Sequence, residues 1–218
     1  MKQLMIDTAT TRLSVALSEA GEIQAEATVM VSKNHAVTLM PMIEQLMAAV
    51  KWTPNMLERI VVTTGPGSYT GIRIGVTTAK TLAYTLNIPL IGVSALQLMA
   101  AAPNTELPVV SLIDARRGNA YIGYYQHNKA LTHDQHASVA DWLRLNSQGR
   151  FLVVGDVEPF RDVLSEYDYI EAPAAHRYGR ASDLVVFIDE TSDVHAFEPE
   201  YLRLAEAEAK WLEGQNNG

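Results

Sequence analysis

The sequence predicts an α/β protein built from two related lobes, and three observations support this fold class. Apolar strand-like runs alternate with helix-like runs along most of the 218 residues. A glycine-rich segment at 65–75 stands where one predicted strand gives way to a helix. An apolar run that ends in aspartate occurs twice, at Asp7 and at Asp114, about half the chain apart.

The first predicted lobe covers residues 1–102. Its strands are short apolar or alternating runs, whereas its helices carry apolar residues every three or four positions. On these patterns we expect strands at 2–7, 13–18, 22–31, 60–64 and 88–93, and helices at 34–50, 70–86 and 94–102. The polar stretch 103–106 then indicates a linker.

The second predicted lobe is smaller and covers residues 103–200. A polar hairpin and another strand follow each aspartate, which we interpret as a duplication of a unit that starts with a β-hairpin, in two lobes facing each other across a cleft. Chance similarity of two hairpins is the alternative. This lobe is expected to be reduced, because it has no glycine-rich counterpart of 65–75. We expect strands at 109–114, 120–125 and 151–155, helices at 139–145 and 159–166, and a last helix at 201–213 that packs back on the first lobe.

Composition excludes several classes of function. The chain carries 17 basic and 25 acidic residues, and its formal charge of −8 argues against a protein that holds nucleic acid alone. It has no cysteine, so disulfides, thiolate metal ligands and thiol nucleophiles are excluded. The N-terminus does not resemble a signal peptide, and no apolar run reaches the roughly 20 residues of a membrane span. We therefore expect a cytoplasmic protein.

The glycine-rich segment has two interpretations. Its bare amides at a helix start could lie near a nucleotide, together with the preceding aspartate. Its GxGxxxG spacing, however, fits neither the dinucleotide fingerprint nor a P-loop, and a tight structural turn is the stronger interpretation. The residues of the possible nucleotide-proximal loop are Asp7, Gly65, Gly67, Ser68 and Thr70.

Small residues recur every four positions on the helix that follows. Gly71, Gly75, Ala79 and Ala83 share one face of it. Glycine inside a helix costs about 1 kcal/mol relative to alanine, so something must benefit from the bare backbone. Close approach of another helix, from this chain or from another, is the simplest explanation. We expect these four residues to form a protein interface.

The helix at 34–50 is apolar around most of its circumference. Such a helix is buried on more than one side, either as a central core helix or at an interface. For the interface we single out Met40, Ile43 and Met47. His35 has no second histidine one turn later, since position 39 is leucine, and we expect no metal site.

Two polar turns remain as candidates. Asp7 is followed by threonines that could bind Mg²⁺ or a phosphate, or simply form the turn. Asp114 precedes Arg116 and Arg117, a pattern that could contact an anion or a partner carboxylate. An exposed hairpin tip is the plainer interpretation.

Several motifs together resemble the bacterial TsaB (YeaZ) family, in order and over nearly the whole chain. They are IDTATTRLSVAL, NHAVTLMP, GPGSYTGIRIG, IDARRGNAY and PEYLR. The resemblance implies two lobes of the actin-like, sugar-kinase and heat-shock ATPase superfamily. It also implies a role in making N6-threonylcarbamoyladenosine in tRNA.

In that family the protein is non-catalytic. The resemblance implies pairing with TsaD, which transfers the threonylcarbamoyl group, and assembly with the ATPase TsaE. It implies a homodimer through the same helical surface when the protein is alone, and contact with tRNA only through the complex. No catalytic residue, metal or cofactor is expected. The chain departs from related patterns at Leu39, at Ala36, and at Thr8 and Ala9, where the superfamily usually has glycine after the aspartate.

Two enzymatic alternatives are weaker. An ATP-dependent phosphotransferase of the same superfamily would use Asp7 and Asp114 across the cleft. A glycoprotease-like metallohydrolase would need a histidine pair, which the chain lacks.

Overall fold

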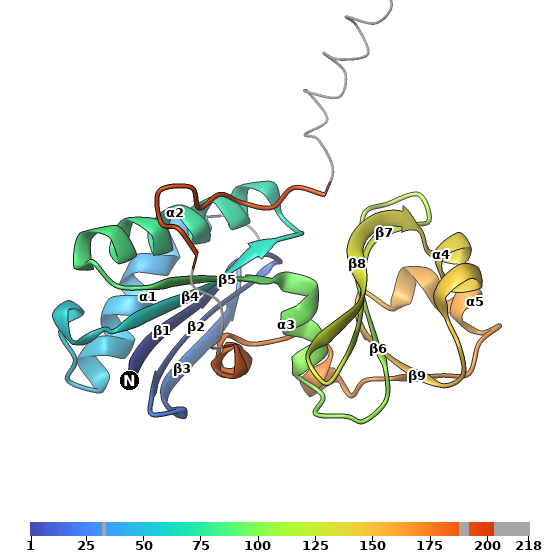
Figure 1. The fold of residues 1–218 in the computed structure, drawn as a ribbon, viewed down its shortest axis with the longest axis horizontal. Coiled ribbons are helices and arrows are strands. Elements are labelled where there is room, and N and C mark those ends of the chain that lie inside the picture. Colours follow the sequence, from blue (N-terminus) through green and yellow to red (C-terminus); the bar gives the residue numbers. More distant parts are fainter. Residues whose placement is uncertain (32–33, 188–191, 203–218) are drawn as a thin grey trace, which may run out of the picture.

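The computed structural model describes residues 1–31, 34–187 and 192–202, and it contains two lobes side by side (Figure 1). Each lobe is built on a five-stranded mixed sheet. The predicted helix at 201–213 falls, apart from its first two residues, outside the described part of the chain. Within that part, no helix is both long enough and apolar enough to cross a bilayer.

The sheet of the first lobe has the strand order β3-β2-β1-β4-β5. The central strand β1 pairs antiparallel with β2 on one side and parallel with β4 on the other. The strands are β1 (Lys2–Asp7), β2 (Arg12–Glu19), β3 (Glu22–Met30), β4 (Arg59–Gly65) and β5 (Leu90–Ser94).

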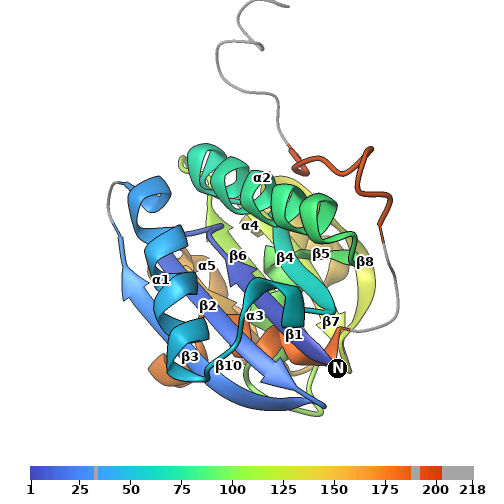
Figure 2. The ribbon, with the colours of Figure 1, turned by 90° about the vertical axis from the view of Figure 1, so that its left-hand side faces the viewer.

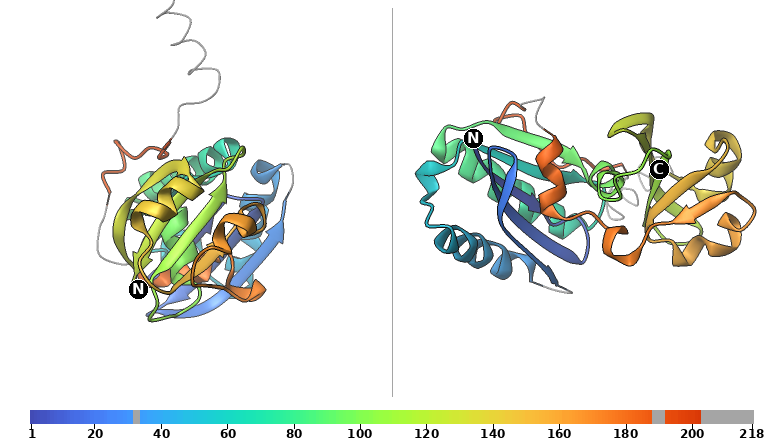
Figure 3. Two further views of the ribbon diagram at one scale, coloured as in Figure 1. Left: turned by 90° about the vertical axis from the view of Figure 1, so that its right-hand side faces the viewer. Right: turned by 90° about the horizontal axis from the view of Figure 1, so that it is seen from below.

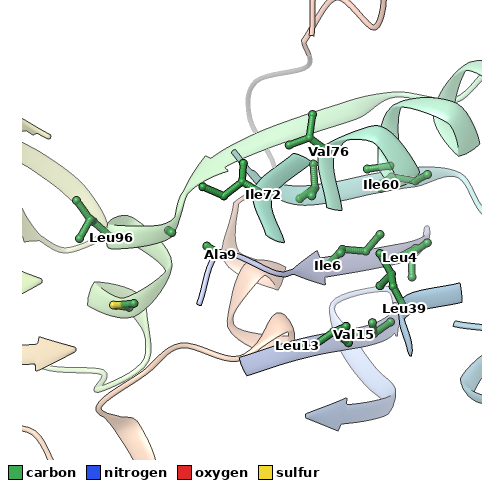
Figure 4. Packing of buried hydrophobic residues seen from close by; sticks show 14 of the residues in the cluster. Leu4, Ile6, Ala9, Leu13, Val15, Leu39, Ile60, Ile72, Val76 and Leu96 are labelled. Atoms are coloured by element: carbon green, nitrogen blue, oxygen red, sulfur yellow. The ribbon is translucent and has the colours of Figure 1, made fainter. Parts of the chain in front are cut away.

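Two long helices cover one face of this sheet, as Figure 2 shows. They are α1 (His35–Ala49) and α2 (Tyr69–Leu86), with a short 3-10 turn η1 (Pro54–Met56) after α1. Leu4, Ile6 and Val15 of the strands pack with Leu39 of α1 and Val76 of α2 in the main core (Figure 4). The helix α3 (Ala95–Ala101) then leads to the second lobe, and its cap Ser94 donates a hydrogen bond to Asp134 there.

The second lobe repeats the strand topology of the first. Its sheet order is β10-β9-β6-β7-β8, with β6 between an antiparallel β7 and a parallel β9, as β1 lies between β2 and β4 (Figure 3). This repetition confirms the predicted duplication. The elements are β6 (Val109–Asp114), β7 (Asn119–Gln126), β8 (Lys129–Ser138), α4 (Val139–Asn146), β9 (Phe151–Gly155), η2 (Glu158–Phe160), α5 (Arg161–Leu164), β10 (Tyr169–Glu171) and η3 (Ala174–His176).

The second lobe is reduced, as predicted, because its helices are short. The helix after β9, α5, has 4 residues, whereas the corresponding α2 has 18. The predicted helix at 159–166 is therefore too long, since its first residues form the 3-10 turn η2. The strands β8 and β10 have no counterpart among the predicted elements.

The last described residues return to the first lobe. The 3-10 segment η4 (Ala181–Val186) places Ala181 and Leu184 against Met5, Ala16 and Val61, on the sheet face opposite α1 and α2. The first sheet carries apolar side chains on both of its faces, so a second element must cover the face that α1 and α2 leave open. The predicted range 103–200 for the second lobe is consequently too long at its C-terminal end.

The packing of η4 against the first sheet leads to a testable prediction. Leu184 is fully buried, so Leu184→Ala removes apolar contacts from the first sheet and leaves a cavity. We expect it to lower the free energy of unfolding by about 2–5 kcal/mol in urea titrations. Leu145→Ala, at a leucine that is 76% exposed, is the matched control with little expected effect. Equal effects of the two substitutions would contradict this packing.

Candidate functional site

The glycine-rich loop joins β4 to α2 by a turn that needs glycine. Gly65 and Gly67 have φ angles of 126° and 153°, which side chains rarely adopt. Ser68 then caps α2, since its Oγ accepts a hydrogen bond from the Gly71 amide at 3.2 Å. The Ser68 amide itself donates to the Ala9 carbonyl at 2.7 Å. The loop thus rests on the turn that follows β1.

The chain itself fills the space around this loop. A β-carbon at Gly67 would overlap the carbonyl of Ala9, and one at Gly65 would meet the carbonyl of Glu200. A phosphate bound at such a junction would require an open cradle of free amides. The loop does not form one, although Ser68 and Thr70 are exposed at its edge.

The stripe of small residues faces inward. Ala79 and Ala83 are 0% and 1% exposed, and β-carbons at Gly71 and Gly75 would overlap the Thr8 carbonyl and hydroxyl. The prediction that another helix packs closely on this stripe is therefore wrong. The close neighbour is the turn after β1, where Thr8 donates a hydrogen bond to the Gly71 carbonyl at 2.8 Å. A partner chain could not contact this buried stripe. A protein interface on α2 would have to use the opposite, exposed face of the helix.

Asp7 is buried beside this turn. Its Oδ1 accepts hydrogen bonds from the Thr63 hydroxyl at 2.7 Å and from the Ala9 amide at 3.1 Å. Burial raises the pKa of Asp7 by more than these hydrogen bonds and the nearby His35 lower it. The Nε2 of His35 lies 3.1 Å from the Thr10 carbonyl oxygen. Across the described residues, no group of three histidine or acidic side chains could hold a metal ion.

The predicted interface residues of α1 divide between two faces. Ile43 and Met47 are buried in the core and are therefore corrected to core residues, because α1 lies directly on β2 and β3. Met40 is 38% exposed and Val37 is 69% exposed. The outward face of α1 is therefore apolar near its start, although most of the helix interior is packed against the sheet.

A groove lies beside this outward face. It has a volume of about 490 Å³. Its lining comes from the start of α1 and the first three turns of α2: Ala36, Tyr69, Thr70, Arg73, Ile74, Thr77 and Thr78. The exposed sides of the two helices therefore form one hollowed surface, and it is the surface on which a partner could pack.

The C-terminal strap, residues 192–202, borders the same surface. Lys80 of α2 donates hydrogen bonds to the carbonyls of His195 at 2.9 Å and Phe197 at 3.0 Å. Tyr201 stacks on Tyr69 with ring centroids 5.0 Å apart. Sequence reasoning missed this strap, although PEYLR, whose start lies in it, was among the motifs of the resemblance.

Asp7 and Asp114 occupy matching positions at the ends of β1 and β6 but differ in surroundings. Asp7 is 4% exposed, whereas Asp114 is exposed at the tip of the β6–β7 hairpin. Asp114 uses its Oδ1 to accept a hydrogen bond from the Arg116 amide at 2.8 Å, as Asp7 does from Ala9. Both carboxylates therefore shape turns.

Comparison with known proteins adds three findings. The family model described as "TsaD: tRNA N6-adenosine threonylcarbamoyltransferase" matches residues 28–160. The tRNA threonylcarbamoyladenosine biosynthesis protein TsaB of Bacillus subtilis (strain 168) is 42% identical over 229 aligned residues, which cover 99% of this chain and 100% of the relative. The solved structure of YeaZ from Pseudomonas aeruginosa superposes with a TM-score of 0.82 at 23% identity, over 92% of this chain and 99% of that one.

A more distant likeness confirms the fold class. The ethanolamine utilization protein EutJ from Carboxydothermus hydrogenoformans superposes with a TM-score of 0.52 at 12% identity, over 86% of this chain and 90% of that one. It has the actin-like ATPase fold. The two lobes of the present chain are therefore actin-like lobes.

The contact between Thr8 and Gly75 can be tested by the sign of the stability change on Gly75→Ala. Helix propensity alone predicts that Gly75→Ala stabilises the protein by about 1 kcal/mol. Because the new methyl group overlaps Thr8, we expect instead a net loss of about 1–2 kcal/mol in urea unfolding. Thr8→Ala in the same chain should reduce that loss, as a double-mutant cycle would measure. A stabilised Gly75→Ala variant would contradict the contact.

The burial of Asp7 predicts a pH-dependent stability. Because its folded pKa is raised, the folded state holds the proton more tightly, and wild-type stability falls as pH rises through that pKa. The Asp7→Asn variant cannot ionise at this position. As pH rises above about 4, the usual range for aspartate, its free energy of unfolding should therefore increase relative to wild type, by at most about 1.4 kcal/mol per pH unit. Asp141→Asn, at an exposed carboxylate, is the control. A pH-independent difference for Asp7→Asn would refute the raised pKa.

Proposed function

The chain belongs to the TsaB family of tRNA threonylcarbamoyladenosine biosynthesis proteins, and we propose that it serves that pathway as a non-catalytic subunit. In this proposal it binds a TsaD-like catalytic subunit, stabilises it and activates it. A TsaE-like ATPase joins the pair, and tRNA is held mainly by the complex. The protein acts in the cytoplasm, and alone it forms a homodimer through the same surface.

The observation that carries the proposal is the outward surface of α1 and α2. It combines the groove of about 490 Å³ with exposed apolar side chains such as Val37 and Met40. An apolar exposed surface of this kind is typical of sites of protein association. A methionine such as Met40 suits an adaptable contact, because its side chain is unbranched and polarizable.

The family-model match supports the choice of partner. The matched residues 28–160 include both α1 and α2, so the two helices belong to the part that resembles the threonylcarbamoyltransferase family. Two chains with similar helical faces can pair about a pseudo-twofold axis, and two identical chains about a true one. One surface thus accounts for both the heterodimer and the homodimer.

The absence of catalysis is also part of the proposal. Ala9 and Glu200 pack against the glycine loop, and one oxygen of the Asp7 carboxylate accepts two hydrogen bonds. These groups therefore stabilise the fold at the position where the superfamily would place chemistry. Micromolar binding of Mg-ATP with turnover by the isolated chain would overturn this part of the proposal.

Substitution on the outward face of α1, beside the groove, tests the proposal directly. Val37→Glu places a carboxylate on the apolar surface, and burying it against a partner is costly. We expect the affinity for the TsaD-like subunit to fall about tenfold or more in titration calorimetry. In a reconstitution with the TsaD-like and TsaE-like subunits, tRNA modification should fall in parallel and should be lost when this chain is left out.

Leu145→Glu is the matched control, since Leu145 is an exposed aliphatic side chain on the other lobe. It should leave binding and modification unchanged. Equal affinities of Val37→Glu and Leu145→Glu for the catalytic subunit would place the interface elsewhere.

A further inference from the structure

The β6–β7 hairpin ends in an unusual turn, which we call the arginine tip (residues 114–118). Arg116 and Arg117 have φ angles of 71° and 55°, and Gly118 follows with 75°. Side chains other than glycine, asparagine and aspartate seldom adopt this left-handed conformation, and here two neighbours do. Both arginines are exposed. The turn therefore presents two neighbouring arginine side chains to solvent.

Hydrogen bonds within the second lobe and one contact from the first lobe support this conformation. The Asp114 amide donates to Oδ2 of Asp156 at 2.9 Å, and the other oxygen of Asp156 accepts from the Tyr178 hydroxyl at 2.6 Å. The guanidinium of Arg12, which begins β2 in the first lobe, lies over the Tyr178 ring at 4.8 Å. A continuous chain of contacts thus links Arg12 to the base of the arginine tip. The tip is preorganised rather than a free loop.

The two arginines of the tip form no ion pair within the described chain, although the exposed Asp114 belongs to the same turn. Among those residues, no carboxylate oxygen lies within 4 Å of a side-chain nitrogen of Arg12, Arg116 or Arg117. Elsewhere on the same lobe, Arg144 pairs with Asp141 at 2.8 Å and Arg150 with Asp168 at 3.4 Å. The tip therefore offers cationic groups to an anion from outside.

The surroundings of the tip distinguish between kinds of anionic partner. A protein interface centres on buried apolar side chains, but the neighbours of the two arginines in the turn are Asp114, Ala115 and Gly118. Contacts to nucleic-acid phosphates, in contrast, are polar and solvated, and arginine makes them with paired N–H groups. The tip fits phosphate better than a protein surface.

We propose that Arg116 and Arg117 contact phosphates of the tRNA backbone in the assembled complex. This inference rests on the proposed function, which brings tRNA to the complex. Since the net charge of −8 opposes binding of nucleic acid by this chain alone, the tip adds contacts to an RNA held mainly by the catalytic partner. Its contribution is independent of sequence, because phosphates carry no base information.

The test compares two double variants with equal net charge. R116Q/R117Q removes the tip, and R144Q/R150Q removes two exposed arginines of the same lobe. Binding of labelled tRNA to the complex with the TsaD-like subunit is measured by fluorescence anisotropy at several salt concentrations. We expect R116Q/R117Q to weaken binding about tenfold and to reduce the salt slope by about two. R144Q/R150Q should bind as wild type does.

Each other outcome has a defined meaning. If the complex forms and both variants bind tRNA equally, the inference is wrong while the proposed function stands. If R116Q/R117Q loses the catalytic subunit, as size-exclusion chromatography would show, the tip binds protein and the inference is again wrong. If no complex forms with the wild-type chain, the proposed function fails. The inference then fails with it, because the proposed phosphate contacts require the assembled complex.

Discussion

The first lobe depends on the close approach between the turn after β1 and the helix α2. Thr8 occupies the space that bare backbone leaves at Gly71 and Gly75, and its hydroxyl donates to the Gly71 carbonyl. Interiors pack at crystal-like density, so even one added methyl group is felt at such a contact. The approach sets the height of α2 above the sheet and seats the glycine loop on Ala9. This contact also determines which side chains of α2 point outward.

The two lobes share a strand topology but differ in what surrounds it. In the first lobe, long helices cover one sheet face and the returning segment η4 covers the other. In the second lobe, the helices α4 and α5 are short, and the sheet face opposite α4 packs against α3. We infer that the reduction of the second lobe leaves the larger contact surface on the first, and that the second contributes polar contacts at its hairpin tip.

Much of this architecture is readable from the sequence, and the failures have physical causes. The repeat of Asp7 and Asp114 predicts the duplicated topology, because each ends an apolar strand before a polar turn. The strand β8 was missed because it is rich in polar residues and depends on its pairing with β7. The periodicity of Gly71 and Gly75 locates a close contact but cannot say what fills it. The strap was missed because its contacts join residues more than 100 positions apart.

Because the glycine stripe faces inward, the two faces of α2 are under different constraints. On the inner face of α2, Thr8 and the core dictate each residue, and little variation is sterically tolerated. On the outer face, residues such as Arg73 and Thr77 are exposed and contribute little to folding. Mutation can therefore change which partner is recognised without a loss of fold stability. The outer face of such a helix can change over evolutionary time while its interior stays fixed.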